Sequence, residues 1–327
     1  MPLNSFQLIK ENFSKYYHTL GEDAFLLSLI RQREFGFILF DKKIMLRHKS
    51  FKSSEALKGF LISLAPSDAY FSAAFYERPT ASMTKKGWQG ADLVFDIDAD
   101  HIPTPCNKRH DKWICSKCGS TDNGPSPKKC PNCREEKFET QTWICDDCLE
   151  SAKTETIKLI EILEDDFGVM KSEISAFFSG HRGYHIHIEN ERVGSLNSMA
   201  RKEIVDYVMG VGFKKQFHKL ARNRRKEAKI DTVVTMDIHR LIRLVGSLHG
   251  KTGFIKTKAS LVNLDKFDPL KEAIAFKKGE IVVNVTEAPE FRIGDVTFGP
   301  FKNVYHEELP TAAALFLLCK GVAQVVE

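Results

Sequence analysis

The sequence predicts a mixed α/β (α+β) fold that is interrupted by a zinc-binding segment. Three observations support this prediction. Apolar and acidic residues alternate over 92–100, apolar residues recur at helical spacing over 150–167, and seven of the eight cysteines lie between Cys106 and Cys148. A period of two is typical of a half-buried strand, and a period of 3.6 is typical of an amphipathic helix. The 327 residues suffice for one large α/β domain or two smaller ones.

The composition excludes several classes of protein. With 43% hydrophobic and 28% charged residues, the chain can bury a sizeable core and is not expected to be disordered. Its net charge of +5 permits nucleic-acid binding without requiring it. The first residues lack the pattern of a signal peptide, and no apolar run approaches the length of a membrane span. We therefore expect a cytoplasmic protein with no membrane partner.

The first ninety residues are expected to mix helices with strands. Apolar spacing predicts helices at 5–20, 23–30 and 54–65. Strands are expected at 33–40, 44–48 and 69–75, with a hairpin turn at 41–43 and a loop from 78 to 90.

The acidic stretch 92–100 is the most informative part of the chain. Asp96, Asp98 and Asp100 are expected to share one face of a strand, while the apolar residues between them face the core. Strand residues two apart are separated by roughly 7 Å, so neighbouring carboxylates repel each other unless a cation lies between them. Hard oxygen ligands suit Mg²⁺ or Mn²⁺. The alternative is an acidic strand face that only contacts water.

The cysteine segment predicts two closed, structural zinc sites. No export signal is seen, so three C-x-x-C pairs indicate metal binding rather than disulfides. Our preferred assignment is nested: a zinc ribbon lies inside a second site, and each site has four ligands. The ribbon ligands are Cys115, Cys118, Cys130 and Cys133, and the second set is Cys106, His110, Cys145 and Cys148. Exchange of the pairs stays open, as does His101 in place of His110.

A turn bracketed by two glycines follows a predicted strand at 174–178. Ser179 supplies a hydroxyl and Arg182 a bidentate donor, and the glycines let backbone N–H groups face an anion. His185 and His187 are expected to share the polar face of the next strand. These features favour a phosphate site over the alternative, a plain hairpin turn with surface histidines.

The last third of the chain adds basic residues. The segment 196–230 is predicted to be helical and basic, either as a solvated face or as a contact for a nucleic-acid backbone. A strand is expected at 231–234. Positive charge then gathers near a glycine-rich loop, as a triphosphate pocket requires, at Arg240, Arg243, His249 and Lys251. A strand at 281–285 and a helix at 311–323, with Cys319 in the core, complete the chain.

Four segments together resemble one known family. They are Arg-Glu-Phe-Gly-Phe at 33–37, the acidic strand at 91–101, the Ser-Gly-His-Arg-Gly-Tyr-His turn at 179–185, and Arg-Leu-Ile-Arg with its glycine-rich loop at 240–250. In this order they resemble the small catalytic subunit of replicative DNA primases, and the archaeal members most. The resemblance implies the prim fold, with an RRM-like half, over 1–327. It also implies an inserted zinc module at 101–149 and a helical, basic segment at 195–230.

The same resemblance implies an activity and its residues. A DNA primase of this family makes short RNA primers, or DNA primers, de novo on single-stranded DNA from NTPs or dNTPs by two-metal-ion nucleotidyl transfer. The implied carboxylates are Asp96, Asp98 and Asp231; Asp237 is a rival to Asp231 but lies too near the Arg-Leu-Ile-Arg motif. The implied nucleotide-binding residues are Ser179, His181, Arg182, His185, Arg243 and His249.

The resemblance also implies cofactors and partners. We expect a catalytic pair of Mg²⁺ or Mn²⁺ ions, two structural Zn²⁺ ions, a heterodimer with the primase large subunit, and contacts with the replication machinery. The ribbon between Cys115 and Cys133 departs from the simplest family members. Two alternatives are a repair or gap-filling polymerase of the same superfamily and a non-catalytic zinc-ribbon subunit that binds nucleic acid.

Overall fold

Two four-stranded antiparallel sheets form the centre of the molecule. The computed structural model describes residues 3–25, 27–40, 44–211 and 227–326. The first sheet has the order β12-β3-β1-β2, with the strands Leu241–Arg243, Asp68–Ser72, Phe35–Ile38 and Met45–Lys49. The second sheet has the order β13-β10-β11-β6, with the strands Thr257–Ala259, Ile174–Phe178, Gly183–Ile188 and Leu93–Asp98.

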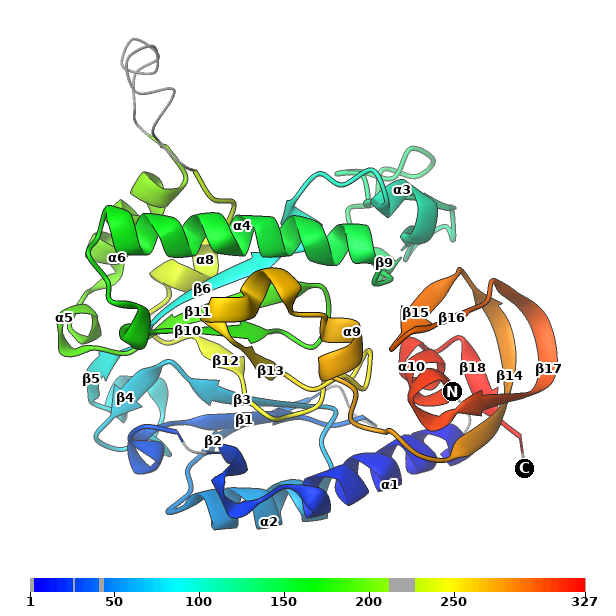
Figure 1. Cartoon of the computed structure of the whole chain (residues 1–327), viewed down its shortest axis with the longest axis horizontal. Coiled ribbons are helices and arrows are strands. Elements are labelled where there is room, and N and C mark those ends of the chain that lie inside the picture. The colour runs from blue at the N-terminus through cyan, green and yellow to red at the C-terminus, as the bar shows by residue number, and fades with distance from the viewer. Residues whose placement is uncertain (1–2, 26, 41–43, 212–226, 327) are drawn as a thin grey trace, which may run out of the picture.

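Helices cover the outer faces of these sheets, so that the layers run helix, sheet, sheet, helix (Figure 1). Helix α4 (Asp146–Asp165) lies across the second sheet, and α1 (Leu3–Thr19) and α2 (Ser54–Leu64) lie under the first. The rings of Phe71 on β3 and His187 on β11 stack with their centroids 6.1 Å apart, so the two sheets face each other. One hydrophobic core therefore runs through all four layers.

A smaller lobe follows the central sheets (Figure 1, red and orange). Its sheet has the order β17-β14-β18, with the strands Phe301–Pro310, Glu280–Ala288 and Ala323–Val325. Helix α10 (Thr311–Lys320) packs against this sheet and buries most of its circumference, as expected for a helix that is apolar all round. The strand predicted at 281–285 lies within β14. The helix predicted at 311–323 is present as α10, but it ends at Lys320, and Ala323 begins β18.

The remaining elements are short. Two hairpins join β4 (Ala74–Tyr76) to β5 (Trp88–Ala91) and β15 (Phe291–Ile293) to β16 (Val296–Phe298). The cysteine segment has a sheet of its own, with the order β8-β7-β9 and the strands Thr121–Asn123, Lys112–Cys115 and Phe138–Gln141. The short α-helices are α3 (Asn107–His110), α5 (Glu191–Gly194), α6 (Ser198–Val208), α8 (Thr232–Met236) and α9 (Pro269–Glu272). The 3₁₀ helices are Glu22–Phe25, Ile30–Gln32, Met83–Lys85, Ala99–His101, Lys171–Glu173 and Leu261–Lys266.

Several predicted elements are confirmed, and two near the N-terminus are wrong. The helices at 5–20, 54–65 and 150–167 are present, although α4 begins earlier, at Asp146. The helix expected at 23–30 is replaced by two 3₁₀ turns, because Leu29 takes a left-handed φ of 52° that no α-helix accommodates. The loop expected at 78–90 contains most of β5, which pairs with β4.

The strand expected at 231–234 is also wrong, because these residues begin helix α8. The Asp231 carboxylate accepts a hydrogen bond from the backbone N–H of Val233 (2.9 Å) and so caps the helix. The strand preference of the two adjacent valines is overridden by this cap and by packing. His185 and His187 share one face of β11 as expected, with their ring centroids 6.4 Å apart, but that face is not at the surface, since all six residues of β11 are buried.

Part of the basic segment lies outside the described residues. Helix α6 confirms helical structure at its beginning, but the lysines and arginines between 212 and 226 fall in the undescribed stretch. Among the described residues, no helix combines the length and apolar character needed to cross a membrane.

Candidate active site

A pocket with a volume of about 410 Å³ opens between the two central sheets. One wall comes from β6, β11 and the turn before β11, and the other from β3, β12 and the loop that follows β12. Its polar lining is Asp68, Tyr70, Asp96, Asp98, Asp100, Thr140, Thr142, Ser179, His181, His185, Arg240, Arg243, His249 and Lys251. Acidic and basic groups therefore face one space, although they come from segments far apart in the chain.

The acidic wall is built on β6, whose pairing with β11 sets Asp96 opposite His185. Burial, with the charges of Asp98 and Asp231, raises the pKa of Asp96 to about 7. Burial and the charge of Asp100 likewise raise the pKa of Asp98 to about 6. Neighbouring half-buried carboxylates repel one another. A divalent cation removes that repulsion, and this oxygen donor set fits Mg²⁺ or Mn²⁺.

Asp231 lies beside this wall, on the first turn of α8. Its backbone N–H donates to the carbonyl of Asp96 (2.8 Å), so the backbones of the two residues touch. The carboxylate caps its own helix and lies 4.0 Å from Nε2 of His101. The structure thus brings Asp231 next to Asp96, and the negative charge of each acts on the other.

His185 lies against the acidic wall. Its Nε2 is 3.5 Å from Oδ1 of Asp96, and its buried Nδ1 has no hydrogen-bond partner among the described residues. Burial and the nearby Lys256 charge lower the pKa of His185 well below its ordinary value, so the ring is neutral. An unpaired buried nitrogen costs free energy unless a ligand pairs with it. Such an atom calls for a water or a ligand as partner, and the residue itself lines the pocket.

The turn from Ser179 to Gly183 needs its glycines. Gly180 has a φ of 89°, and a Cβ on Gly183 would lie 2.2 Å from the carbonyl oxygen of Ile97. The close approach of backbones lets the turn stack His181 on His249, with their ring centroids 5.2 Å apart. Both rings line the pocket beside Ser179.

The basic wall is held by an ion pair that the sequence did not reveal. Arg243 on β12 donates to Oδ1 of Asp68 on β3 (2.6 Å), and its guanidinium lies over the ring of Tyr70. Burial alone would raise the pKa of Asp68, but the charges of Arg243 and His249 outweigh it and hold the value at about 2. Arg243 is thus fixed in place at the pocket, next to Arg240 and Lys251.

Arg182 departs from the expectation that it binds a phosphate. Its buried guanidinium donates to Asp111 (2.8 Å to Oδ2) and pairs with Asp100. It is absent from the lining of the 410 Å³ pocket and lies instead in a smaller neighbouring pocket with Asp111. In this structure its charge is already matched by carboxylates, and it faces the zinc module.

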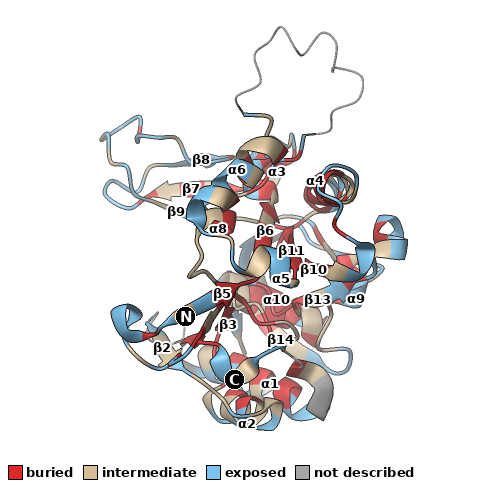
Figure 2. Ribbon diagram, turned by 90° about the vertical axis from the view of Figure 1, so that its left-hand side faces the viewer, coloured by how far each residue is buried: buried red, intermediate tan, exposed pale blue. Residues whose placement is uncertain are grey.

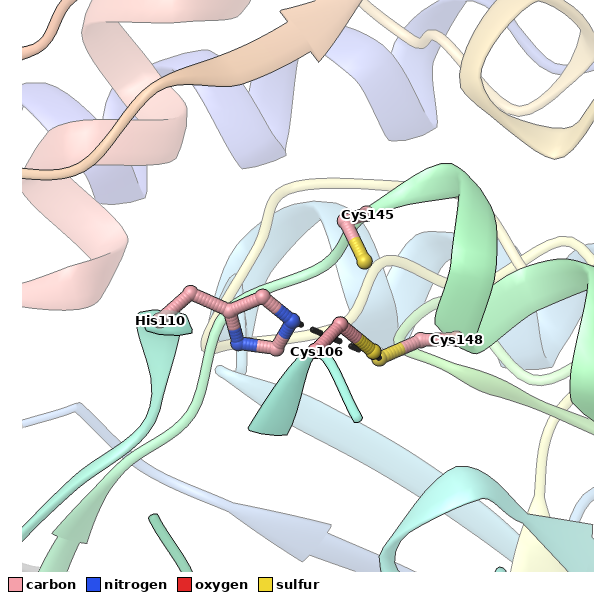
Figure 3. Close-up of side chains that lie close together, drawn as sticks. All are labelled: Cys106, His110, Cys145 and Cys148. Atoms are coloured by element: carbon pink, nitrogen blue, oxygen red, sulfur yellow. Dashed lines mark hydrogen bonds between the residues drawn. The ribbon is translucent and has the colours of Figure 1, made fainter. Parts of the chain in front are cut away.

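Two groups of four zinc-type ligands lie in the cysteine segment. In each group, one ligand atom per residue lies within 4.8 Å of the others. The inner tetrad is Cys106, His110, Cys145 and Cys148 (Figure 3), and the outer tetrad is Cys115, Cys118, Cys130 and Cys133. These are the two nested groups preferred from the sequence.

The inner tetrad has the geometry of a zinc site. Nε2 of His110 lies 3.5 Å from Sγ of Cys148, and Nδ1 of the same ring lies 2.8 Å from Oδ1 of Asp111. A zinc-bound histidine usually donates its second ring N–H to such a carboxylate. Three thiols and one imidazole complete a tetrahedral set, which fits Zn²⁺ and leaves no open position.

Comparison with known proteins decides the family. A sequence model of the DNA primase small subunit matches residues 128–260. The DNA primase small subunit PriS of Cenarchaeum symbiosum is 34% identical, with 97% of each chain covered. The chain belongs to the DNA primase small subunit family. The proteins of the same name from Pyrobaculum aerophilum and Archaeoglobus fulgidus are 36% and 32% identical over 84% and 96% of this chain, and over 85% and 97% of their own lengths.

This primase subunit is therefore an enzyme, a nucleotidyltransferase of DNA replication, as its sequence motifs implied. Among solved structures, the polymerase domain of Mycobacterium tuberculosis ligase D in complex with DNA is 12% identical. It has a TM-score of 0.43 over 80% of this chain and 83% of the other. That likeness is too distant to bear on the site.

The predicted catalytic and nucleotide-binding residues of this primase line the pocket, except Asp231 and Arg182, and residues that were not predicted support them. Asp68 and Tyr70 hold Arg243, and Asp111 holds both His110 and Arg182. An alternating polar pattern at 68–70 was the available signal for the first two. It could not reveal their partner, which lies far along the chain.

Proposed function

We propose that the pocket between the two sheets is the site where this subunit forms the first and later phosphodiester bonds of a primer on single-stranded DNA. The observation that supports this most is the arrangement of its walls. Half-buried carboxylates on β6 line the same pocket as Arg243 and His249, and its volume of about 410 Å³ is large enough for a nucleotide's phosphates. Nucleotidyl transfer needs these two kinds of group on opposite sides of the reacting phosphate.

The acidic wall holds the catalytic metals in this proposal. Asp96 and Asp98, joined by Asp231, would ligate two Mg²⁺ or Mn²⁺ ions. Such ions, when bound, lower the pKa of an attacking hydroxyl and neutralise charge on the leaving pyrophosphate. The carboxylates must be ionised to bind them, and each bound cation lowers the raised pKa values of Asp96 and Asp98.

The remaining lining residues bind the incoming nucleotide. The neutral His185 lines the pocket, and Ser179 and His181 add a hydroxyl and an imidazole from the turn. Arg243, with its guanidinium fixed by Asp68, supplies positive charge for the triphosphate, and His249, whose pKa is lowered by burial, adds a neutral imidazole beside it. Because Arg182 is paired with two carboxylates, we assign it no contact with the nucleotide.

The proposal extends to partners and to the structural metals. Each tetrad would hold one Zn²⁺, which orders the module that carries it. The enzyme would act as a heterodimer with a primase large subunit on single-stranded DNA, with NTPs or dNTPs as substrates. A new chain can begin only if the site accepts two nucleotides on the template, so primer initiation is the activity to test.

The test is de novo synthesis on a single-stranded DNA template with labelled NTPs or dNTPs and Mn²⁺ or Mg²⁺. We expect wild type to make template-dependent products, and Asp98→Asn to reduce them by at least about a thousandfold, as expected when a metal ligand is lost. Asp295→Asn, an exposed aspartate near the end of β15, is the matched control and should retain activity.

Each outcome bears on the proposal. Synthesis by a folded Asp98→Asn variant at a rate near wild type would refute the assigned metal site. Extension of supplied primers without initiation, even with the large subunit present, would favour a gap-filling polymerase. No incorporation of either kind by folded wild type with its large subunit would contradict the proposed site.

A further inference from the structure

A chain of buried polar contacts joins the inner tetrad to the acidic strand. It starts at His110, whose Nδ1 lies 2.8 Å from Oδ1 of Asp111. Asp111 accepts two hydrogen bonds from Nη1 of Arg182, at 3.0 and 2.8 Å. The other end of the same guanidinium pairs with Asp100. One zinc-type ligand is thus three contacts away from the end of the strand that carries Asp98.

The backbone makes the link to Asp98 tight. The carbonyl of Arg182 accepts a hydrogen bond from the N–H of Ala99 (3.1 Å), and the next residue, Gly183, pairs in register with Asp98. The N–H of Asp100 donates to Oδ1 of Asp98 (2.9 Å). Hence the residues that hold Arg182 also set the turn that orients the Asp98 carboxylate.

Burial makes this arrangement specific. The side chains of Arg182 and Asp111 are only 2% and 6% exposed. The backbone of Trp143 closes the network, because its N–H donates to Asp111 (3.0 Å) and its carbonyl accepts from Arg182 (3.2 Å). Removing one partner of a buried ion pair leaves an uncompensated charge, so the network holds one arrangement firmly. A planar guanidinium can join two carboxylates at once, which a lysine cannot do in the same way.

We propose that Asp111 and Arg182 are positioning residues that couple zinc at the inner tetrad to divalent-cation binding at the acidic strand. Zinc fixes the His110 ring, the ring fixes Asp111, and Asp111 with Arg182 fixes the turn that orients Asp98. This inference rests on the proposed function, in which Asp98 is a ligand of the catalytic metals. The proposal assigns Arg182 a positioning role in place of the phosphate contact that was expected from the sequence.

Coupling between two sites is reciprocal. If zinc at the inner tetrad strengthens binding of Mg²⁺ or Mn²⁺, then Mg²⁺ must strengthen the binding of zinc by the same factor. A merely structural role for Arg182 would lower stability, but it would not make the two affinities depend on each other. The dependence itself is therefore the quantity to measure.

The first measurement is the Mn²⁺ dissociation constant of zinc-loaded full-length protein, from the EPR signal of free Mn²⁺. We expect Arg182→Gln and Asp111→Asn to weaken Mn²⁺ binding by about tenfold or more, the usual effect of losing a residue that orients metal ligands. The matched control is Arg292→Gln. Arg292 also bridges two carboxylates, Asp146 and Asp268, and Asp146 adjoins the tetrad ligand Cys145. This bridge differs in that it leads to α9 rather than to β6. The control variant should bind Mn²⁺ within about twofold of wild type.

The second measurement is the zinc affinity of the inner tetrad with and without saturating Mg²⁺, in a Cys118→Ser background that removes a ligand of the outer tetrad. We expect Mg²⁺ to tighten zinc binding by about fivefold or more, and Arg182→Gln to abolish this effect. If Mg²⁺ does not change the zinc affinity of protein that retains Arg182, the proposal is overturned. This comparison does not require the Arg182→Gln variant to fold.

The two measurements separate failure of this inference from failure of the proposed function. The coupling alone would be overturned if Asp98→Ala abolished Mn²⁺ binding while the zinc-loaded Arg182→Gln and Asp111→Asn variants bound Mn²⁺ as tightly as wild type. Absence of any Mn²⁺ binding that depends on Asp98 would overturn the metal site and the coupling together.

Discussion

The two tetrads have nearly the same ligands but very different surroundings. In the inner tetrad, Cys106 and Cys148 are fully buried and pack against Ala99, which directly follows the acidic strand. In the outer tetrad, Cys118 is exposed, and the apolar contacts come from Trp113 and Phe138 of its own ribbon. Figure 2 shows β8 and β9 of the ribbon largely in the colour of exposed residues, whereas β7 between them is buried or half-buried.

This difference indicates that the structural effect of each tetrad depends on the residues that its ligands contact. The inner tetrad touches the first turn of α4, Asp111 and Ala99, and Ala99 lies between two residues that line the candidate pocket, Asp98 and Asp100. The outer tetrad orders a small three-stranded sheet whose other side chains are mostly exposed. We expect loss of zinc from the first to disturb the catalytic core, and loss from the second to disturb the ribbon alone.

The largest effect is expected from Cys148→Ser. This fully buried ligand lies in the first turn of α4, and its loss leaves an incomplete site within the core. We expect one zinc ion per chain to be lost and the free energy of unfolding to fall by about 4 kcal/mol or more. Elemental analysis and calorimetry measure the two changes. A variant that loses its zinc yet unfolds at the wild-type temperature would contradict the integrated role of the inner tetrad.

A smaller and local effect is expected from Cys118→Ser. Its side chain is exposed, so the free energy of unfolding of the main body should change by less than about 1 kcal/mol. One zinc ion should still be lost, and limited proteolysis should cut within 116–137 faster than in wild type. Primer synthesis falling as far as in Cys148→Ser would show that the two tetrads do not differ as we describe.

Binding of Mg²⁺ at the acidic strand is expected to depend on pH. The two tetrads should contribute little to Mg²⁺ binding, because thiolates do not suit this ion. The pKa of Asp96 is raised to about 7 and that of Asp98 to about 6, so at pH 6 the Asp96 carboxyl is mostly protonated and the Asp98 carboxyl about half protonated. Mg²⁺ must displace these protons, and its affinity should rise as the pH increases from 5 to 8.

Calorimetry in two buffers of different ionisation enthalpy measures this proton release. We expect about one proton per chain to be released on Mg²⁺ binding at pH 6 and almost none at pH 8.5. The Asp96→Asn variant should release fewer protons than wild type when it binds Mg²⁺ at pH 6. Equal proton release at both pH values would show that the carboxylates are not perturbed in this way.

The smallest effect is expected from Arg109→Ala. Arg109 lies next to the ligand His110 and pairs with Asp147, but the two side chains are 69% and 62% exposed. An exposed pair contributes about 0–1 kcal/mol, so zinc content and melting temperature should stay near wild type. A loss comparable with that of Cys148→Ser would mean that proximity to the tetrad matters more than burial.

The sequence predicted what depends on local spacing. C-x-x-C pairs fix where two thiols can meet, and the period-two pattern over 93–98 placed Asp96 and Asp98 on one face of β6. The glycine-bracketed turn was also recognisable from its own residues, because glycine allows the tight backbone turn seen at Gly180. These features need no knowledge of distant partners.

The features that the sequence could not predict are long-range pairings. Arg243 meets Asp68 across 175 positions, and Arg182 meets Asp111 across 71. Which carboxylate lies next to which guanidinium depends on strand order, and strand order depends on the packing of the whole core. The motif at 33–37 is another example of a long-range pairing. Its Arg33 forms a buried ion pair with Asp92 (2.8 Å), the residue directly before β6.

The most direct test of the central claim, that β6 holds the catalytic metals while the tetrads hold zinc, is anomalous diffraction from crystals soaked with Mn²⁺ and a nucleoside triphosphate. Data collected at the manganese and zinc absorption edges locate each metal separately. We predict manganese peaks at the carboxylates of Asp96 and Asp98, and one zinc peak in each tetrad. Manganese peaks elsewhere in the pocket, or none at these carboxylates with the triphosphate bound, would contradict the account.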